Sequence, residues 1–275
     1  MLIFYLYGGN SMARNSLKNV ARLIDIANDE VSIENQFLTD LQNSIEKTVE
    51  QNSTLPSKTY KPSGMNCDRA MVYQVLGYEP DKGRASYQLE GICESGTDRH
   101  IRIQKAIENM GKVLNIDCEY ISVADFVKQR NLDYLEIKGQ SGMETKLYHK
   151  NFNMSFMTDG IIKYKGKYFV FEFKTETADK FYQRKDVDPK HYNQATAYAL
   201  AFKLDKVLFI YENRNTCDKK AFIREVTGEM KDQLIQKLQY CNRFVEKNKI
   251  PPKPVNLDKR NCMYCGYHSY CGDDL

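Results

Sequence analysis

The chain has 275 residues, a formal net charge of +4 and 42% hydrophobic residues. This length can bury one sizeable core with appended elements. The mild charge excludes a polybasic tail protein, so any binding of nucleic acid has to come from local patches. The apolar stretch at residues 1–7 is far too short to span a membrane, and we expect no signal peptide. We therefore expect a reducing, cytoplasmic location and no membrane partner, while the oligomeric state stays open.

The first part of the chain is predicted to be helical. Residues from about 11 to 58 are polar and typical of helices, in particular residues 17–27 and 32–50, and a linker rich in Pro, Ser and Lys follows around residues 55–63. Two more helices are predicted within residues 64–112, the second beginning at Ser95 or Thr97 as its N-cap. Residues 1–62 are accordingly predicted as a separate helical N-terminal element.

The middle of the chain predicts an α/β fold, with a mixed sheet flanked by helices. A short strand is expected at residues 117–123 and a charged loop at residues 128–142. A hairpin should follow, and its elements are a strand over residues 153–164, a turn at Lys165 and Gly166, and a return strand over residues 168–175. After it we expect a helix over 191–204, a strand over 206–213 and a helix over 229–247 that ends before Pro251. The predicted domains are a core at residues 63–250 and a cysteine tail at residues 251–275.

The hairpin carries the polar residues of greatest interest. Side chains alternate across a strand, so Glu172 and Lys174 should share one face, where Asp159 can reach them, while Phe169, Phe171 and Phe173 pack on the other. Magnesium takes oxygen ligands, so Asp159, Glu172 and the carbonyl of Phe173 are candidate ligands. Lys174 would orient or help deprotonate the attacking water and offset charge on a phosphate.

Other interpretations of these residues stay open. Glu172 and Lys174 are also what an exposed ion pair on an ordinary strand looks like. His100, on the first turns of its predicted helix, is a candidate ligand through a ring nitrogen or an ordinary polar residue. Gln194 and Tyr198 lie four residues apart on one face of a helix that is either functional or simply packs on the sheet.

Taken in order, these motifs resemble the PD-(D/E)xK nucleases, in particular their RecB-like branch. That branch has a G-x-x-x-H helix, an Asp at the end of a strand, a (D/E)-x-K strand and a Q-x-x-x-Y helix. The matching positions are Gly96 to His100, Asp159, Glu172 to Lys174, and Gln194 to Tyr198. The one departure is Thr158, which stands where the family often has proline.

The resemblance implies a restriction-endonuclease-like core and assigns roles to residues. His100, Asp159 and Glu172 would be ligands of Mg²⁺ or Mn²⁺, and Lys174 would be the catalytic lysine. Gln194 and Tyr198 would contact the nucleic acid or steady the site. We also expect seven basic residues around this site, where a phosphate backbone would pass. They are Lys163, Lys165, Lys167, Lys180, Arg184, Lys185 and Lys190.

The cysteines give a second, separate signal. Three of the eight form a C-x2-C-x5-C tail at Cys262, Cys265 and Cys271, a spacing that indicates shared metal ligation in a reducing compartment. The fourth ligand is either His268, which would make a local zinc knuckle, or Cys67, which would tie the tail to the body. Thiolates suit both zinc and an iron-sulfur cluster.

Here too there is a resemblance. Nucleases of the AddB type and the CRISPR adaptation nucleases carry one cysteine before the core and three after it, which together bind a 4Fe-4S cluster. The matching positions are Cys67, Cys262, Cys265 and Cys271. We favour the iron-sulfur interpretation, with zinc as the alternative. The other four cysteines are expected to be small buried hydrophobic residues.

Together these features predict a metal-dependent DNA nuclease, an exonuclease or end-processing enzyme of recombination, repair or CRISPR adaptation. Its substrate would be DNA that is single-stranded or has free ends, in a bacterial, archaeal or phage-infected cell. A helicase, a recombinase or a CRISPR adaptation protein would be its partner. The alternative is a catalytically inactive DNA-binding subunit with a structural iron-sulfur or zinc site.

Overall fold

The computed structural model describes residues 33–52, 57–81, 86–141, 144–254, 262–263 and 265–271. The predicted helix at residues 17–27 and the apolar stretch at residues 1–7 lie outside them. The chain divides into two compact units. The described part of the smaller unit is helix α2 (Ile33–Asn52) with residues 86–90. Helix α2 confirms the predicted helix at residues 32–50, and most of its side chains are exposed.

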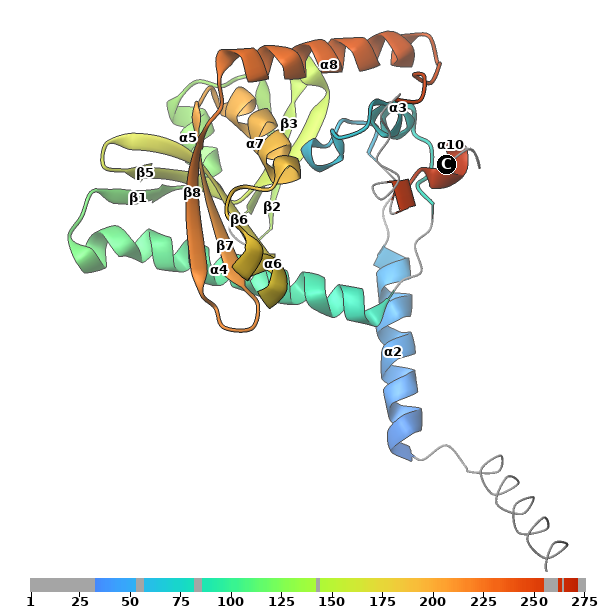
Figure 1. Cartoon of the computed structure of the whole chain (residues 1–275), viewed down its shortest axis with the longest axis horizontal. Coiled ribbons are helices and arrows are strands. Elements are labelled where there is room, and N and C mark those ends of the chain that lie inside the picture. The colour runs from blue at the N-terminus through green and yellow to red at the C-terminus, as the bar shows by residue number, and fades with distance from the viewer. Residues whose placement is uncertain are drawn as a thin grey trace, which may run out of the picture. The chain divides into compact units, whose positions relative to one another are not determined.

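The larger unit is built on a five-stranded mixed sheet with the order β1-β5-β6-β7-β8 (Figure 1). Strands β6 and β7 run parallel, and the other neighbours are antiparallel. The strands are β1 (Cys118–Ile121), β5 (Gly160–Tyr164), β6 (Lys167–Glu176), β7 (Lys206–Asn213) and β8 (Lys219–Glu225). The predicted α/β class with a mixed sheet flanked by helices is therefore confirmed, as are the return strand and the strand at residues 206–213.

A second, antiparallel sheet has the order β2-β3-β4. Its strands are β2 (Leu135–Ser141), β3 (Glu144–His149) and β4 (Met154–Thr158). The charged loop predicted at residues 128–142 is wrong, because this segment ends helix α5 (Val123–Gln129) and then forms β2. The strand escaped prediction because its apolar alternation is short: Leu135 and Ile137 alternate with charged residues, but residues 138–141 are polar or glycine.

The strand predicted over residues 153–164 is in fact two strands. Strand β4 pairs with β3, whereas β5 pairs with β6, so the chain changes sheets at Asp159. Gly160 makes the change possible, since its φ is +140° and a Cβ there would lie 2.6 Å from the ring of Tyr120. The break leaves Asp159 between the two sheets.

Helices cover both faces of the five-stranded sheet (Figure 1). On one face Phe171 and Phe173 form a cluster with Ile103 and Ile107 of α4 (Tyr87–Leu114). On the other, strand residues such as Val170 share the main core with the buried alanines of α7 (Pro189–Phe202). The alternation predicted for β6 is confirmed. The remaining helices are α3 (Asp68–Leu76), α6 (Ala178–Gln183), α8 (Gly228–Glu246), α10 (His268–Cys271), η1 (Pro62–Gly64) and η2 (Lys150–Phe152).

Helix α4 is longer than predicted. It begins at Tyr87, so Ser95 and Thr97 are interior residues and His100 lies near its middle. The Thr97 hydroxyl donates to the carbonyl of Cys93, one turn earlier, at 3.2 Å. A threonine hydroxyl can be satisfied in this way within a helix, which is why it did not mark a helix start.

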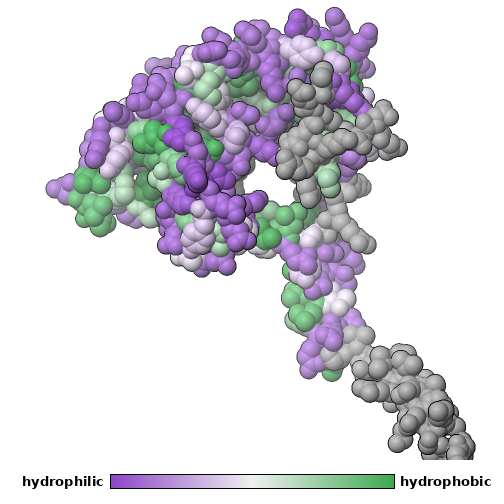
Figure 2. All heavy atoms as spheres, in the orientation of Figure 1, coloured by the Kyte–Doolittle hydropathy of each residue, from purple (hydrophilic) through white to green (hydrophobic). Residues whose placement is uncertain are grey.

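The surface at the carboxyl end of α4 is apolar (Figure 2). The exposed large hydrophobic residues there are Val113, Leu114 and Ile116. Among the described residues, no helix combines the length and the apolar character needed to cross a membrane.

Candidate metal centre

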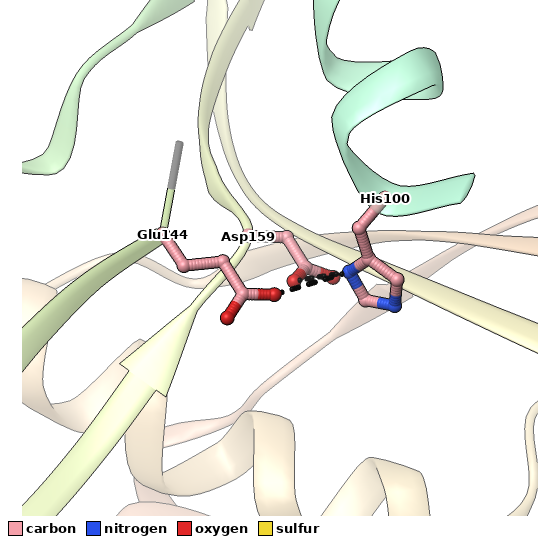
Figure 3. A group of neighbouring side chains, drawn as sticks. All are labelled: His100, Glu144 and Asp159. Carbon is pink, nitrogen blue, oxygen red and sulfur yellow. Dashed lines mark hydrogen bonds and ion pairs between the residues drawn. The ribbon is translucent and has the colours of Figure 1, made fainter. Parts of the chain in front are cut away.

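Three side chains that could hold a metal ion meet where the chain changes sheets (Figure 3). They are His100 from α4, Glu144 from the first residue of β3, and Asp159. The His100 Nδ1 atom lies 2.9 Å from Asp159 Oδ1 and 3.3 Å from Glu144 Oε1. One ligand atom of each residue lies within 4.8 Å of the others. Residues far apart in the sequence therefore form one compact group of a nitrogen and two carboxylate oxygens.

Asp159 is fixed by hydrogen bonds from three neighbours. The backbone N–H of Phe173 donates to Asp159 Oδ2 at 2.6 Å. The Gln104 amide and the Tyr120 hydroxyl both donate to the Asp159 carbonyl, each at 2.7 Å. Only 5% of Asp159 is exposed, so these contacts form in a place that water barely reaches. The carboxylate is therefore held in position by the fold itself.

The charges of this group favour a cation between them. Burial by itself lowers the pKa of His100, but hydrogen bonds to Asp159 and Glu144 outweigh it and raise the pKa to about 10. The imidazolium thus balances one of the two carboxylate charges. A divalent ion would balance both, with His100 binding it as the neutral imidazole, and the donor set fits such an ion, because carboxylate oxygens suit Mg²⁺ and Mn²⁺ and the imidazole suits a transition metal such as Mn²⁺.

Next to this group, Glu172 and Lys174 start a second line of contacts. Lys174 Nζ lies 2.5 Å from Glu172 Oε1 and 3.4 Å from Gln194 Oε1. The Gln194 amide then donates to the Tyr198 hydroxyl at 2.6 Å. The four residues predicted on β6 and α7 are thus brought together, between the strand and the helix.

The electrostatics of this line couple it to the metal group. Burial raises the pKa of Glu172, the ion pair with Lys174 opposes this, and the nearby Asp159 carboxylate adds to the rise. Burial lowers the pKa of Lys174, but the charges of Glu172 and Asp159 more than compensate, so its pKa is raised and the side chain is an ammonium. Lys174 is therefore suited to donating hydrogen bonds rather than to accepting a proton.

Glu144 is the residue that the sequence did not reveal. It begins a strand that was not predicted, and no spacing in the sequence links it to His100 or Asp159. In the compact group it occupies the place that was expected for Glu172, whose carboxylate instead binds Lys174. Metal ligation by Glu172 and by the Phe173 carbonyl stays a prediction.

The basic residues expected around the site do not all lie there. Lys163, Lys165 and Lys167 are at the turn between β5 and β6. Lys167 lies seven positions before Lys174 along β6, about 23 Å at about 3.3 Å per residue. Arg184 is bound to Glu176 by two hydrogen bonds, at 2.7 and 2.5 Å. Four of the seven basic residues expected around the site are thus either distant from Lys174 along the sheet or paired with an acidic side chain.

The cysteine tail packs against the segment that begins with Cys67. The backbone N–H of Asp81 donates to the Gly266 carbonyl at 2.5 Å, and the Tyr73 hydroxyl donates to the Tyr270 carbonyl at 2.9 Å. Burial and interactions with Cys67, Cys271 and Cys262 raise the pKa of the Cys265 thiol. The four predicted cysteines are therefore electrostatic neighbours, and close thiolates need a cation or a cluster to ionise together.

The other four cysteines were expected to be buried, and this is wrong for three of them. Cys241 is buried, but Cys118 is only partly buried and Cys93 and Cys217 are exposed.

Arg69, two residues after Cys67, lies beside the four predicted cysteine ligands. Its guanidinium donates to the Pro251 carbonyl at 2.9 Å and to the Tyr73 hydroxyl at 3.0 Å, and it hydrogen-bonds Cys271. Its buried Nε has no partner among the described residues. A buried donor of this kind fits an anionic metal-thiolate group, while the exposed side chain of His268 fits a ligand role less well.

Comparisons with known proteins complete the description. No family model and no curated protein sequence matches the chain. The solved structure of SSO0001 is similar with a TM-score of 0.44 and 16% identity, over 87% of this chain and 98% of that one. LHK-Exo in complex with dAMP is similar with a TM-score of 0.38 and 9% identity, over 70% of this chain and 90% of that one. At this level of likeness, the chemistry has to be read from the chain's own side chains.

Proposed function

We propose that this protein is a divalent-metal-dependent nuclease that hydrolyses phosphodiester bonds in DNA. The observation that carries the proposal is the meeting of His100, Glu144 and Asp159 within 4.8 Å, beside the ion pair of Glu172 and Lys174. Two carboxylates aimed at a polyanion repel it unless a cation lies between them. A nearby buried ammonium is the group that a phosphoryl reaction needs.

The residues have separate tasks in this reaction. When bound, Mg²⁺ or Mn²⁺ would polarise the phosphate and lower the pKa of water. His100, Glu144 and Asp159 would hold it, with Glu172 as the further predicted ligand. Lys174 donates hydrogen bonds to the phosphate oxygen on which negative charge grows. The water oxygen bonds to phosphorus and releases a proton to solvent, while the leaving sugar oxygen separates from phosphorus and takes up a proton.

Gln194 and Tyr198 act through Lys174 in this scheme. Gln194 binds the ammonium of Lys174 on one side and the hydroxyl of Tyr198 on the other. Tyr198 is buried and stacks on Phe156 of β4 at a centroid distance of 5.3 Å. The arrangement favours the steadying role over direct contact with DNA, because a buried Tyr198 has little surface to offer a substrate.

The finer assignment follows the resemblance to RecB-like nucleases. It comprises action on single strands or free ends, exonuclease or end-processing chemistry, and a 4Fe-4S cluster on Cys67, Cys262, Cys265 and Cys271, with zinc as the alternative. The packing of the tail on residues 67–81 and the unpartnered Nε of Arg69 support a shared ligand at the four cysteines.

The test is cleavage of end-labelled single- and double-stranded DNA with Mg²⁺, with Mn²⁺, and in EDTA, by protein purified without oxygen. We expect cleavage that requires the metal and a brown protein that contains iron. Metal-dependent binding without cleavage would favour the inactive DNA-binding subunit, and a colourless protein that contains zinc would replace the cluster by a zinc site.

A further inference from the structure

A group of cations surrounds one buried carboxylate near the metal centre. Glu212, near the end of β7, has a fully buried side chain. Its Oε1 lies 2.8 Å from Arg99 Nη1 and 2.5 Å from Arg102 Nη2, both on α4, and its Oε2 lies 3.1 Å from Lys219 Nζ at the start of β8. Two elements of the larger unit, α4 and β8, therefore supply three positive charges to one carboxylate of β7.

The positive charge exceeds what Glu212 requires. One carboxylate balances one cation, so two of the three positive charges remain. Arg214, an exposed residue, adds a fourth, and its Nε donates to the Thr175 hydroxyl at 3.1 Å. The nearby carboxylate of Asp218 accepts a hydrogen bond from Thr216 at 2.7 Å and removes part of the excess. The group stays positive overall.

The cations have surface left for a ligand. The side chains of Arg102 and Lys219 are 49% and 36% exposed, while Glu212 beneath them is inaccessible. Arg99 is held more tightly, because its second amino group donates to the Arg214 carbonyl at 2.9 Å. Figure 2 shows a hydrophilic surface over β8 and its loop. A buried carboxylate that fixes guanidinium groups while their outer edges face solvent is a suitable base for an anion site.

This surface adjoins the metal centre. Arg99 directly precedes His100 in α4. Glu212 pairs with Thr175 in the parallel ladder of β6 and β7, so it takes the face of the sheet opposite to Lys174, the face on which the ring of Phe173 contacts the ring of His100. A strand whose scissile phosphate lies at the metal would carry its neighbouring phosphates within reach of this surface, since phosphates along a strand repeat every few ångströms.

We propose that four cations positioned by Glu212 bind the backbone phosphates that neighbour the cleaved phosphate on the same DNA strand. These cations are Arg99, Arg102, Arg214 and Lys219. The proposal rests on the nuclease function proposed above and adds to it the surface that holds the substrate. Because the contacts reach only the backbone, the site binds strands without regard to their sequence.

The test is binding of a fluorescein-labelled single-stranded oligonucleotide in EDTA, by fluorescence anisotropy over a series of KCl concentrations. Arg102→Ala and Lys219→Ala should each weaken binding and reduce the slope of log affinity against log salt by about 0.7. The double variant should lose about 1.4 of slope. Arg102→Lys keeps the charge and should restore most of the slope. Lys167→Ala, an exposed cation at the other end of β6, is the matched control and should change nothing.

Several results would overturn the inference. The double variant could bind with the parent's affinity and slope, or Lys167→Ala could lower the slope as much. Inorganic phosphate could displace the DNA far better than chloride of equal ionic strength, which would indicate a site for free phosphate. If the parent binds no DNA in EDTA, the inference is also overturned. The nuclease proposal is decided separately, by cleavage with the metal present.

Discussion

The metal centre and the cysteine tail are built in opposite ways. At the metal centre, Asp159 is held by the Phe173 amide, Gln104 and Tyr120, between two hydrogen-bonded sheets. The tail is short, and two of the four predicted cysteine ligands lie in the described segment at residues 265–271, which has only Tyr267 buried. One site is therefore prepared by the fold, whereas the described part of the tail has little buried surface of its own to hold it in place.

The difference teaches where metal binding and folding are coupled. A site prepared by buried hydrogen bonds loses reactivity when its ion is removed but keeps its shape. A site that gathers thiolates on a small segment gains folding energy from the ion, because the unfolded tail has no such site. Substitutions at the metal centre should therefore lower the cleavage rate, whereas substitutions at the cysteine tail should lower the stability of the protein.

The largest effect is expected at Asp159. Asp159→Asn keeps an acceptor for the Phe173 amide but removes a negative ligand, so cleavage should fall by about a thousandfold or more, since metal stabilisation of a phosphoryl reaction is worth several kcal/mol. The melting temperature should change little. Glu136→Gln, an exposed carboxylate on β2, is the control. Cleavage near the parent rate would remove Asp159 from the metal centre.

At the tail, the loss should be structural. Cys67→Ser should remove the bound metal and lower stability by about 3 kcal/mol or more, a fall in melting temperature of about 6 °C or more. Metal content by iron and zinc assay and thermal unfolding measure this. Cys217→Ser is the control and should change neither. If Cys67→Ser keeps its metal while His268→Ala loses it, the site is a local zinc knuckle and Cys67 is not a ligand.

A third variant separates charge stabilisation from metal binding within the first region. Lys174→Ala should lower the cleavage rate about a hundredfold, because one positioned charge-stabilising group is lost. The affinity for Mn²⁺, measured by calorimetry, should stay close to that of the parent. A rate within a few-fold of the parent would make Lys174 only the partner of Glu172.

The sheet that carries Glu144 can be tested through pH. His149, at the other end of β3, lies between the rings of Tyr134 and Phe152, and burial lowers its pKa from 6.5 to about 4. Between these values the unfolded chain binds more protons than the folded one, so stability rises with pH and is lost as pH falls. His149 should contribute about 2 kcal/mol to this rise between pH 5 and 7.

His149→Phe removes the titration and keeps an aromatic ring in place. Urea unfolding at pH 5, 6 and 7 should therefore show a smaller rise in the free energy of unfolding for the variant than for the parent. Equal rises in both proteins would mean that His149 binds its proton as readily in the folded state as in the unfolded state.

The smallest effect is expected for the variants that decide between Glu144, identified in the structure, and Glu172, predicted from the sequence, as the metal ligand. Glu144→Gln removes the negative charge of one proposed ligand and should weaken Mn²⁺ binding about tenfold or more, since even residues that only support the ligands contribute that much. Glu172→Gln should mainly release Lys174 and lower the rate. If only Glu172→Gln weakens Mn²⁺ binding, the sequence prediction identifies the ligand and Glu144 is a neighbouring acid.

The sequence by itself determined the features that depend on local pattern. The alternation of Glu172 and Lys174 with phenylalanines fixes which face of β6 each side chain takes, and the alanines of α7 fix how closely that helix packs. Both follow from the period of a strand or a helix, which neighbouring residues set on their own. The cysteine spacing likewise needed no fold to indicate a shared ligand.

Only the tertiary structure decided which distant residues meet. No local pattern could show that the chain changes sheets at Asp159, because strand pairing is non-local and Gly160 is needed only since Tyr120 packs against it. The same pairing brings Glu144 to His100 and places Glu212 beneath Arg99 and Arg102. Charges that look scattered along the sequence become a site only when sheets and helices place them within ångströms of one another.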